Sequence, residues 1–476
     1  MNLTKSPLKL YASVKAVIVQ LLYLPGNNRV SNIVNRVKEM ADKDVQSCLN
    51  KVRKDFANRH RNLEQIFLAH FRLIEKQYEA VSMPISDSKQ LLLGAYFTKE
   101  YSIQAAALFN PSIVPHPQQQ GLKPGELRFV MSLRATGEGH ISSVVFQTGI
   151  VDSKANITLD ESPQYFTRLD KAKDSLYTKD FIRSPLIAVA DFDERILSAL
   201  PDSFTAAQAG TLLKSLSDKD SSLEKSIRYV DDVIDLNYEL ESAPDLPVNE
   251  KVIFPCSRAE SMGMEDVRFV QFKDGNHSCY YGTYTAYDGK QIRTQLIETT
   301  DFSVFKIRSL SGEAISDKGM ALFPEKVNGK YVMIARQGGE KINIMFSADL
   351  YRWEEFEILM EPKYAWELVQ LGNCGSPVKT GKGWLLLTHG VGPMRTYVIS
   401  AILLDLNNPS RVIGRLDKPL IEANQTEREG YVPNVVYTCG CMLHQNVLII
   451  PYAVSDAATG FAAVLLNELL NEMIYQ

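Results

Sequence analysis

The chain has 476 residues, of which 45% are hydrophobic and 23% are charged, and its formal net charge is −4. A chain of this length buries a large core, as two or three domains or as one large domain built from repeats. The near-neutral charge excludes a global basic field of the kind that attracts nucleic acid, and there is no acidic tail. Binding partners must therefore be inferred from individual sites.

The cysteines and the N-terminal apolar stretch bear on the compartment. The six cysteines are scattered, and the close pair Cys439-Gly-Cys441 fits neither a zinc ligand pair nor a redox C-x-x-C motif. We interpret them as reduced thiols in a reducing compartment. The apolar stretch 16–24 is broken by Gln20, lacks a small-residue cleavage site and is too short to span a bilayer, so it predicts a buried strand. These features predict a cytoplasmic protein with no metal site and no membrane partner.

Two regions have the apolar spacing of helices. In the first region, residues 1–85, the spaced apolar positions are Ile33, Val34, Val37, Met40, Val45, Cys48, Leu49, Val52, Phe56, Leu63, Ile66, Phe67, Phe71 and Ile74. The second lies at about 193–245, where Thr205 is a suitable N-cap. We therefore predict an N-terminal helical module, 1–85, followed by a domain, 86–476, that carries a helical insertion at about 193–245.

The rest of the chain after about Leu91 has the pattern of short strands separated by turns. Turn sequences around Gly275, Gly329 and Gly381 recur 54 and 52 residues apart, and Asp301-Phe-x-x-Phe305 recurs as Asp349-Leu-x-x-Trp353, 48 residues later. A period of about 50 residues with several strands per unit predicts a β-propeller, with room for roughly five or six blades. A β-sandwich is the competing all-β fold, but it has no reason to repeat its turn chemistry.

One segment places two carboxylates beside an arginine. In Gly263-Met-Glu-Asp-Val-Arg268, Arg268 is close enough in sequence to pair with Glu265 or Asp266. Such pairing can divide two carboxyls into one ionised group and one that holds a proton, which acid catalysis requires. The alternative is a structural salt bridge that orders a turn.

Polar residues at strand ends suggest an anion site. Lys318, Arg336 and His389 occupy similar positions around three successive strands, so in a propeller they would converge and could bind phosphate. Each could instead be an isolated residue that is solvated or caps the core. Asp456 follows a late strand, where it could bind sugar hydroxyls or form a turn.

Four motifs in order give the chain a resemblance to a known family. They are Phe109-Asn-Pro111, Gly263-Met-Glu-Asp-Val-Arg268, Leu322-Phe-Pro-Glu-Lys326 and His389-Gly-Val391. From about Gly94 to the C-terminus the chain resembles glycoside hydrolase family 130. The resemblance implies a mainly β fold, a five-bladed β-propeller, and cleavage of β-mannosidic bonds with inversion.

The resemblance also implies roles for individual residues. It makes Asp266 the single catalytic acid. The residues that match mannose ligands are Asn110, Arg134 and Asp456, and those that match phosphate ligands are Lys318, Arg336 and His389. One position departs from the phosphorylase pattern, because Gln370 stands where those members carry a further lysine.

The expected reaction is phosphorolysis of a β-mannoside to α-mannose 1-phosphate, with inorganic phosphate as co-substrate and no cofactor. Phosphate is already an anionic nucleophile, so the reaction needs an acid but no base. Two alternatives remain open: an inverting β-mannosidase with Glu265 or Glu325 as the base, and a glycan-binding propeller without catalysis. The expected partner is a β-linked mannoside or oligosaccharide, and the sequence leaves a homo-oligomer open.

Overall fold

A computed structural model describes residues 1–78, 85–186, 189–316 and 318–475. The chain divides into two compact units: a large unit, comprising Met1–Ala12, Ala106–Glu161 and Leu169–Gln476, and a small unit, comprising Ser13–Ala105 and Ser162–Arg168. The sequence placed a boundary at 85/86, whereas the chain passes between the units after Ala12, Ala105, Glu161 and Arg168. The first residues belong to the large unit because β1 (Leu3–Tyr11) pairs antiparallel with β30 (Ala458–Leu465), near the other end of the chain.

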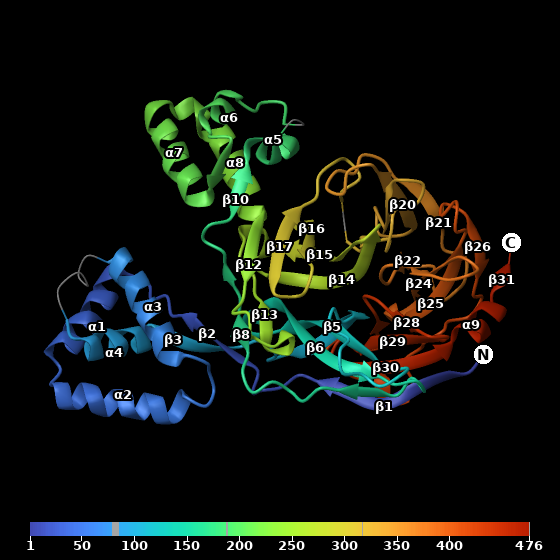
Figure 1. The fold of residues 1–476 in the computed structure, drawn as a ribbon, viewed down its shortest axis with the longest axis horizontal. Coiled ribbons are helices and arrows are strands. Elements are labelled where there is room, and N and C mark those ends of the chain that lie inside the picture. Colours follow the sequence, from blue (N-terminus) through green and yellow to red (C-terminus); the bar gives the residue numbers. More distant parts are fainter. Residues whose placement is uncertain (79–84, 187–188, 317, 476) are drawn as a thin grey trace. The chain divides into compact units, whose positions relative to one another are not determined.

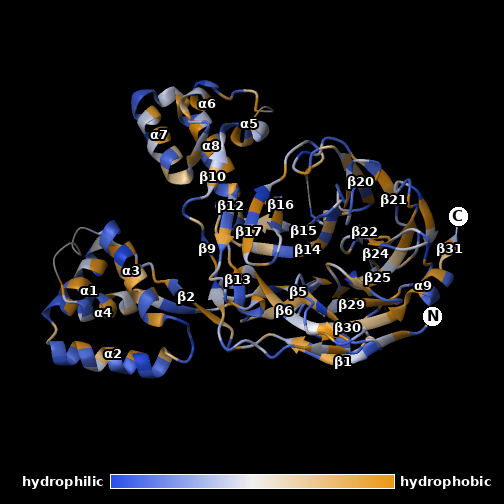
Figure 2. Cartoon of the chain, viewed as in Figure 1, coloured by the Kyte–Doolittle hydropathy of each residue, from blue (hydrophilic) through white to orange (hydrophobic). Residues whose placement is uncertain are grey.

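The small unit is mostly helical. Its elements are β2 (Val17–Leu21), α1 (Asn27–Glu39), α2 (Asp42–Phe56), α3 (Leu63–Gln77), α4 (Asp87–Tyr96), β3 (Thr98–Ser102) and β8 (Thr167–Arg168). The predicted helices and the predicted strand within 16–24 are confirmed. Figure 2 shows α2 as largely hydrophilic, and its buried residues Val45 and Leu49 lie four positions apart, on one face.

The large unit is mainly β, as predicted. One sheet has the order β4-β5-β6-β14-β15-β16-β17-β12-β9, and β7 and β13 pair with β6. Its strands are β4 (Ala107–Pro115), β5 (Leu127–Thr136), β6 (Ser142–Val151), β7 (Ile157–Leu159), β9 (Asp170–Lys171), β12 (Tyr238–Glu241), β13 (Lys251–Ile253), β14 (Gly263–Asp274), β15 (His277–Tyr287), β16 (Ile292–Thr299) and β17 (Val304–Ser309).

Three further sheets follow along the chain (Figure 1). The first consists of β18 (Ala321–Leu322), β19 (Tyr331–Ala335), β20 (Ile342–Ser347) and β21 (Glu357–Met360). The second consists of β22 (Gln370–Asn373), β23 (Val378–Lys379), β24 (Trp384–Val391), β25 (Tyr397–Leu404), β26 (Val412–Arg415) and β31 (Ile474–Tyr475). The third consists of β27 (Val436–Tyr437), β28 (Met442–His444), β29 (Val447–Val454), β30 and β1; α9 (Leu466–Asn471) follows β30.

The predicted tight turns join neighbouring strands. Gly275 joins β14 to β15 with φ 58°, and Gly329 lies between β18 and β19 with φ 79°. Glycine adopts this left-handed backbone without a steric penalty, which explains the glycine at these two turns.

The helical insertion leaves the β region between β9 and β12. It consists of β10 (Leu176–Thr178), α5 (Lys179–Leu186), α6 (Arg195–Ala199), β11 (Ser203–Thr205), α7 (Ala206–Lys219) and α8 (Glu224–Leu236). Thr205 caps α7 as predicted, in a reciprocal capping box with Gln208. The insertion has its own apolar cluster around Ile182, Ile196 and Leu213. It therefore begins earlier than the predicted start at about 193.

Successive groups of strands pack through apolar clusters. One cluster joins β5 and β6 to β14 and β15, the next joins β14 and β16 to β19 and β20, and a third joins β19 and β20 to β24 and β25. A fourth joins β24 and β25 to β29 and β30, and a fifth joins β29 back to β4. The last group thus contacts the first, although no sheet in the described residues closes on itself.

Candidate active site

Backbone irregularities position the predicted acid and its amide neighbour. The pairing of β14 with β15 shifts register between Glu265 and Arg268, and Asp266 within this bulge has φ 56°. The pairing of β4 with β5 shifts register after Phe109, and Asn110 has φ 49°. Asparagine and aspartate tolerate this left-handed region better than most residues. Bulges re-aim side chains, and these two bring Asn110 against Asp266.

Arg134 links two carboxylates. Its Nη1 donates to Asp266 Oδ1 at 3.3 Å, and its Nη2 donates to Glu265 Oε1 at 2.7 Å. Asn110 Nδ2 donates to the same Asp266 oxygen at 2.7 Å, and Lys318 Nζ donates to Glu265 Oε2 at 2.8 Å. Both oxygens of Glu265 therefore bind cations. A continuous polar chain runs from Asn110 through Asp266, Arg134 and Glu265 to Lys318.

The expected pairing of Arg268 with a carboxylate is wrong. Its guanidinium donates to three other oxygens: the backbone oxygen of Asp266 at 2.8 Å, the backbone oxygen of Cys374 at 3.1 Å, and the Tyr437 hydroxyl at 2.6 Å. Arg268 is buried, so these bonds fix the backbone at Asp266. The side chain that pairs with both carboxylates is Arg134, which comes from β5, and Lys318 pairs with Glu265 alone.

Two carboxyl groups of the site have opposite pKa shifts. Burial raises the pKa of Asp266, but the charges of Arg134 and Arg268 and the Asn110 hydrogen bond outweigh burial and leave this pKa below its usual value. Burial and the Asp266 charge raise the pKa of Asp456 to about 7, against the opposing charges of Arg134 and Arg395. Of these two carboxyl groups, Asp456 therefore holds a proton more readily than Asp266.

We expect Asp456→Asn to stabilise the fold more at pH 8 than at pH 5. The pKa of Asp456 is raised from 3.8 to about 7 in the folded chain. Between pH 3.8 and about 7, the folded chain therefore keeps the Asp456 proton, whereas the unfolded chain has released it. Wild-type stability therefore falls as pH rises through this range, whereas asparagine does not titrate. The difference in unfolding free energy should grow by about 1–2 kcal/mol from pH 5 to pH 8. Denaturant unfolding at both pH values measures it, and an equal difference at both would contradict the assignment.

The predicted phosphate ligands Lys318 and Arg336 lie together. Arg336 Nε donates to the backbone oxygen of Lys318 at 3.4 Å. Arg336 also lies against Gly319 and Gly372. A Cβ atom added at Gly319 would lie 2.9 Å from Arg336 Nε, and one added at Gly372 would lie 3.2 Å from Arg336 Cδ, so the two glycines leave room for the Arg336 side chain. Sequence reasoning missed this role of the two glycines, although Gly372 lies only two residues after Gln370.

His389 joins this cluster as a neutral ring. It is buried, and burial together with the charges of Arg336 and Arg268 holds its pKa well below 6.5. Its Nδ1 lies 3.2 Å from the backbone oxygen of Asn373, and its Nε2 lies 3.2 Å from Gln370 Nε2. Nδ1–H then donates to the carbonyl, and Nε2 accepts from the Gln370 amide. The expectation of a third cation is thus corrected to two cations and a neutral histidine.

The structure separates Glu325 from the other predicted residues. Glu325 forms an ion pair with Lys379, and the adjacent Lys326 pairs with Asp274 at 2.7 Å. Asp274 is the last residue of β14 and Asp266 is its fourth, so the strand places them on the order of 20 Å apart. Glu325 is therefore too far from Asp266 to act as its base partner.

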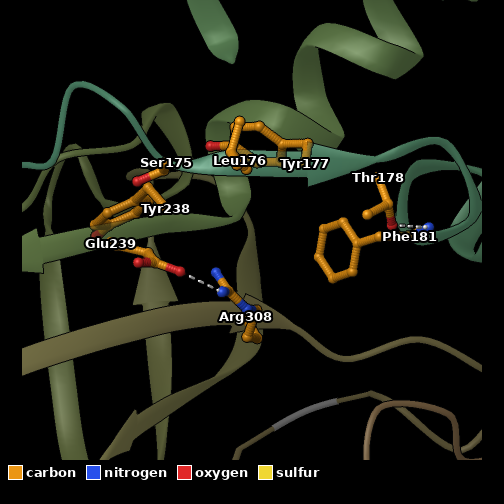
Figure 3. A pocket seen from close by; sticks show the side chains of 8 residues that line it. All are labelled: Ser175, Leu176, Tyr177, Thr178, Phe181, Tyr238, Glu239 and Arg308. Carbon is orange, nitrogen blue, oxygen red and sulfur yellow. Dashed lines mark hydrogen bonds and ion pairs between the residues drawn. The ribbon is translucent and has the colours of Figure 1, made fainter. Parts of the chain in front are cut away.

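A cavity outside this cluster lies beside the helical insertion. Ser175, Leu176, Tyr177, Thr178, Phe181, Tyr238, Glu239 and Arg308 line it (Figure 3). Its charged groups, Arg308 and Glu239, satisfy each other at 2.9 Å. None of the residues predicted for the site lines this cavity.

Two features are absent from the described residues. No cluster of three or more His, Cys, Asp or Glu side chains could hold a metal ion. None of the helices has the length and apolar character needed to cross a membrane.

The order and spacing of these residues match a known family. A family profile described as β-1,4-mannooligosaccharide phosphorylase matches residues 230–474, just over half of the chain. The chain belongs to glycoside hydrolase family 130. The resemblance seen in the four motifs is thereby confirmed. Asn110 and Arg134 precede the matched segment, and the fold brings both against Asp266 within it.

Several members of family 130 are similar in sequence. A 1,2-β-oligomannan phosphorylase from Thermoanaerobacter sp. (strain X514) is 34% identical over 215 residues, which are 44% of this chain and 71% of the relative. A β-1,2-mannobiose phosphorylase from Listeria innocua is 29% identical over 228 residues, 46% of this chain and 63% of the relative. The solved complex of the Listeria innocua β-1,2-mannobiose phosphorylase with β-1,2-mannobiose aligns with TM-score 0.46 at 20% identity, covering 77% of this chain and 92% of that one.

Proposed function

We propose that this family 130 enzyme cleaves β-mannosides by phosphorolysis with inversion and releases α-mannose 1-phosphate. The observation that carries the proposal is the polar chain from Asp266 through Arg134 and Glu265 to Lys318, which joins a carboxyl to a cluster of cations. A carboxyl can protonate a leaving oxygen, and adjacent cations can hold an anionic nucleophile. The related phosphorylases support the same chemistry.

For the fold, we propose a five-bladed propeller. The blades would be β4–β6, β14–β17, β18–β21, β22–β26, and β27–β30 with β1. Five apolar clusters between consecutive groups, the last joining β29 to β4, support a closed ring of blades. The proposed acid, the proposed mannose ligands and the proposed phosphate ligands come from different blades, as expected for a site at the central axis of a propeller.

Asn110, Arg134 and Asp456 are proposed to bind the mannose whose bond breaks. Asn110 Oδ1 is buried and has no hydrogen-bond partner among the described residues, so it is available to accept from a sugar hydroxyl. Asp456 has φ 50° in the turn between β29 and β30, and the charge of Arg134 acts on it. The three side chains thus gather around Asp266.

Lys318 and Arg336 are proposed to bind phosphate by charge-assisted hydrogen bonds, with His389 beside them. Gln370 offers an amide in place of the lysine expected by resemblance, and that amide already contacts His389. Two cations, Lys318 and Arg336, would then contact the phosphate, and Lys318 is shared with Glu265.

The proposed step has Asp266 as its proton donor. A phosphate oxygen forms a bond to the anomeric carbon as the glycosidic C–O bond breaks, and the Asp266 proton goes to the departing oxygen, directly or through a sugar hydroxyl. The charge of Lys318 helps to keep the pKa of Asp266 low. Phosphate bound at Lys318 would neutralise that charge and raise this pKa, so the nucleophile itself would promote protonation of the acid. The phosphate ester then releases its remaining proton to solvent, and Asp266 takes up a proton from solvent to restore the acid.

The proposed compartment is the cytoplasm, because all six cysteines are unpaired.

The test is product analysis with defined substrates. The enzyme is incubated with β-1,2-mannobiose or β-1,4-mannobiose, with and without inorganic phosphate, and products are followed by ³¹P NMR. We expect α-mannose 1-phosphate to form only when phosphate is present. Release of free mannose at a rate independent of phosphate would mean hydrolysis and would overturn the proposal.

Arg336→Ala in the same assay tests the phosphate site. Loss of one charge-assisted contact should raise the KM for phosphate about tenfold or more, with a smaller change in the KM for the disaccharide. Lys341→Ala is a matched control, since Lys341 pairs with Glu361 near the protein surface. Equal changes in both KM values for Arg336→Ala would remove Arg336 from the phosphate site.

A further inference from the structure

Two exposed aromatic residues meet beside the proposed mannose residues. His140 and Tyr431 have stacked rings with centroids 6.0 Å apart and an interplanar angle of 29°. The Tyr431 hydroxyl and His140 Nδ1 lie 3.0 Å apart, within hydrogen-bond distance. Tyr431 nevertheless remains 51% exposed. A large aromatic side chain that is held in place yet open to solvent is available to contact a ligand.

The His140 side of the pair is tied to Arg134. His140 lies in the turn between β5 and β6, with φ 61°, and its backbone N–H donates to the Gly137 oxygen at 3.1 Å. Two residues later, Ser142 Oγ accepts from Arg134 Nε at 2.9 Å. His140 therefore lies in the turn of the hairpin whose strand β5 carries Arg134, the residue that pairs with Asp266.

The Tyr431 side of the pair is tied to Asp456. The N–H of Val432, the next residue, donates to the Ser455 oxygen at 2.9 Å, and Ser455 precedes Asp456. The same loop is braced where Arg428 Nε donates to Asn434 Oδ1 at 2.8 Å. Tyr431 and Asp456 are therefore neighbours across this hydrogen bond.

We propose that His140 and Tyr431 form a platform that binds the leaving-side sugar of the β-mannoside, the sugar that becomes the released hydroxyl product. The platform rests on the proposed function, because it bridges the two elements that carry the proposed mannose ligands Arg134 and Asp456. The broad face of Tyr431 matches the apolar C–H face of a sugar ring, and such contacts orient a ligand without requiring charge.

The reverse reaction tests the platform, because it treats the two sugars separately. Mannose 1-phosphate is the donor, mannose or a mannobiose is the acceptor, and released phosphate is measured. Tyr431→Ala should raise the KM for the acceptor about five- to tenfold and leave the KM for mannose 1-phosphate within about twofold. Tyr431→Phe keeps the ring and should stay near wild type. His140→Ala removes the side chain that holds the Tyr431 ring, and it should raise the KM for the acceptor by a smaller factor than Tyr431→Ala does.

Three results would overturn the platform. An unchanged acceptor KM in Tyr431→Ala would show that the ring does not touch the leaving-side sugar, and a raised KM for mannose 1-phosphate would place it in the mannose site. If wild type transfers no mannose in either direction, the proposed function fails instead.

In that case the platform is tested by calorimetric titration of wild type and Tyr431→Ala with β-1,2-mannotriose and β-1,4-mannotriose. Binding that is equal in wild type and Tyr431→Ala, or absent in both, would reject it.

Discussion

Asp266→Asn is expected to lower kcat for β-mannoside phosphorolysis by a factor of about 10² to 10⁴, with little change in fold or in sugar affinity. The amide keeps the shape of the carboxyl and can still interact with Asn110, but it has no acid proton to give to the leaving oxygen. Steady-state rates and thermal unfolding of the purified variant measure both quantities.

Asp160→Asn is the matched control for this substitution. Asp160 also accepts a side-chain hydrogen bond, from Thr148 at 2.6 Å, and lies 3.9 Å from Arg128, but it has no part in the proposed chemistry. We expect it to retain wild-type activity. An Asp266→Asn enzyme within a few-fold of wild type would remove Asp266 from the acid role.

Arg134→Ala should have the second large effect, lowering kcat/KM by a factor of about 10² or more. Its side chain is only 19% exposed and pairs with Glu265 and Asp266, so its removal leaves two adjacent carboxylates without their shared cation. Breaking a buried pair from one side costs about 3–5 kcal/mol, and part of that loss should appear in the transition state. The loss of positive charge should also raise the pKa of Asp266.

Arg308→Ala separates this effect from a general loss of stability. Arg308 is 16% exposed and pairs with Glu239 at 2.9 Å, outside the candidate site. It should lower the unfolding temperature with little effect on kcat/KM. If Arg308→Ala and Arg134→Ala lower kcat/KM equally, Arg134 acts only through stability.

Local sequence signals predicted much of the architecture. The turns at Gly275 and Gly329, the N-cap at Thr205 and the helical spacing before residue 78 all depend on neighbouring residues, and all are confirmed. The pairing of β1 with β30 was not predicted, because its partners lie more than 400 residues apart and no local pattern encodes such a contact.

The candidate site was predictable as a set of residues but not as a set of contacts. The motif around Asp266 drew attention to Arg268, the nearest cation in sequence, whereas the partner is Arg134, 132 residues away. Sequence distance was misleading because a bulge turns the Asp266 side chain toward another strand. Burial, which sequence cannot supply, makes His389 neutral and raises the pKa of Asp456.

In the proposed site, mannose lies over Asp266 and phosphate lies against Lys318 and Arg336. A crystal structure of the enzyme soaked with mannose and inorganic phosphate tests it most directly. We predict phosphate oxygens within hydrogen-bond distance of both cations, and mannose hydroxyls within that distance of Asn110 and Asp456. Phosphate bound away from both cations, or mannose bound away from Asp266, would contradict the account.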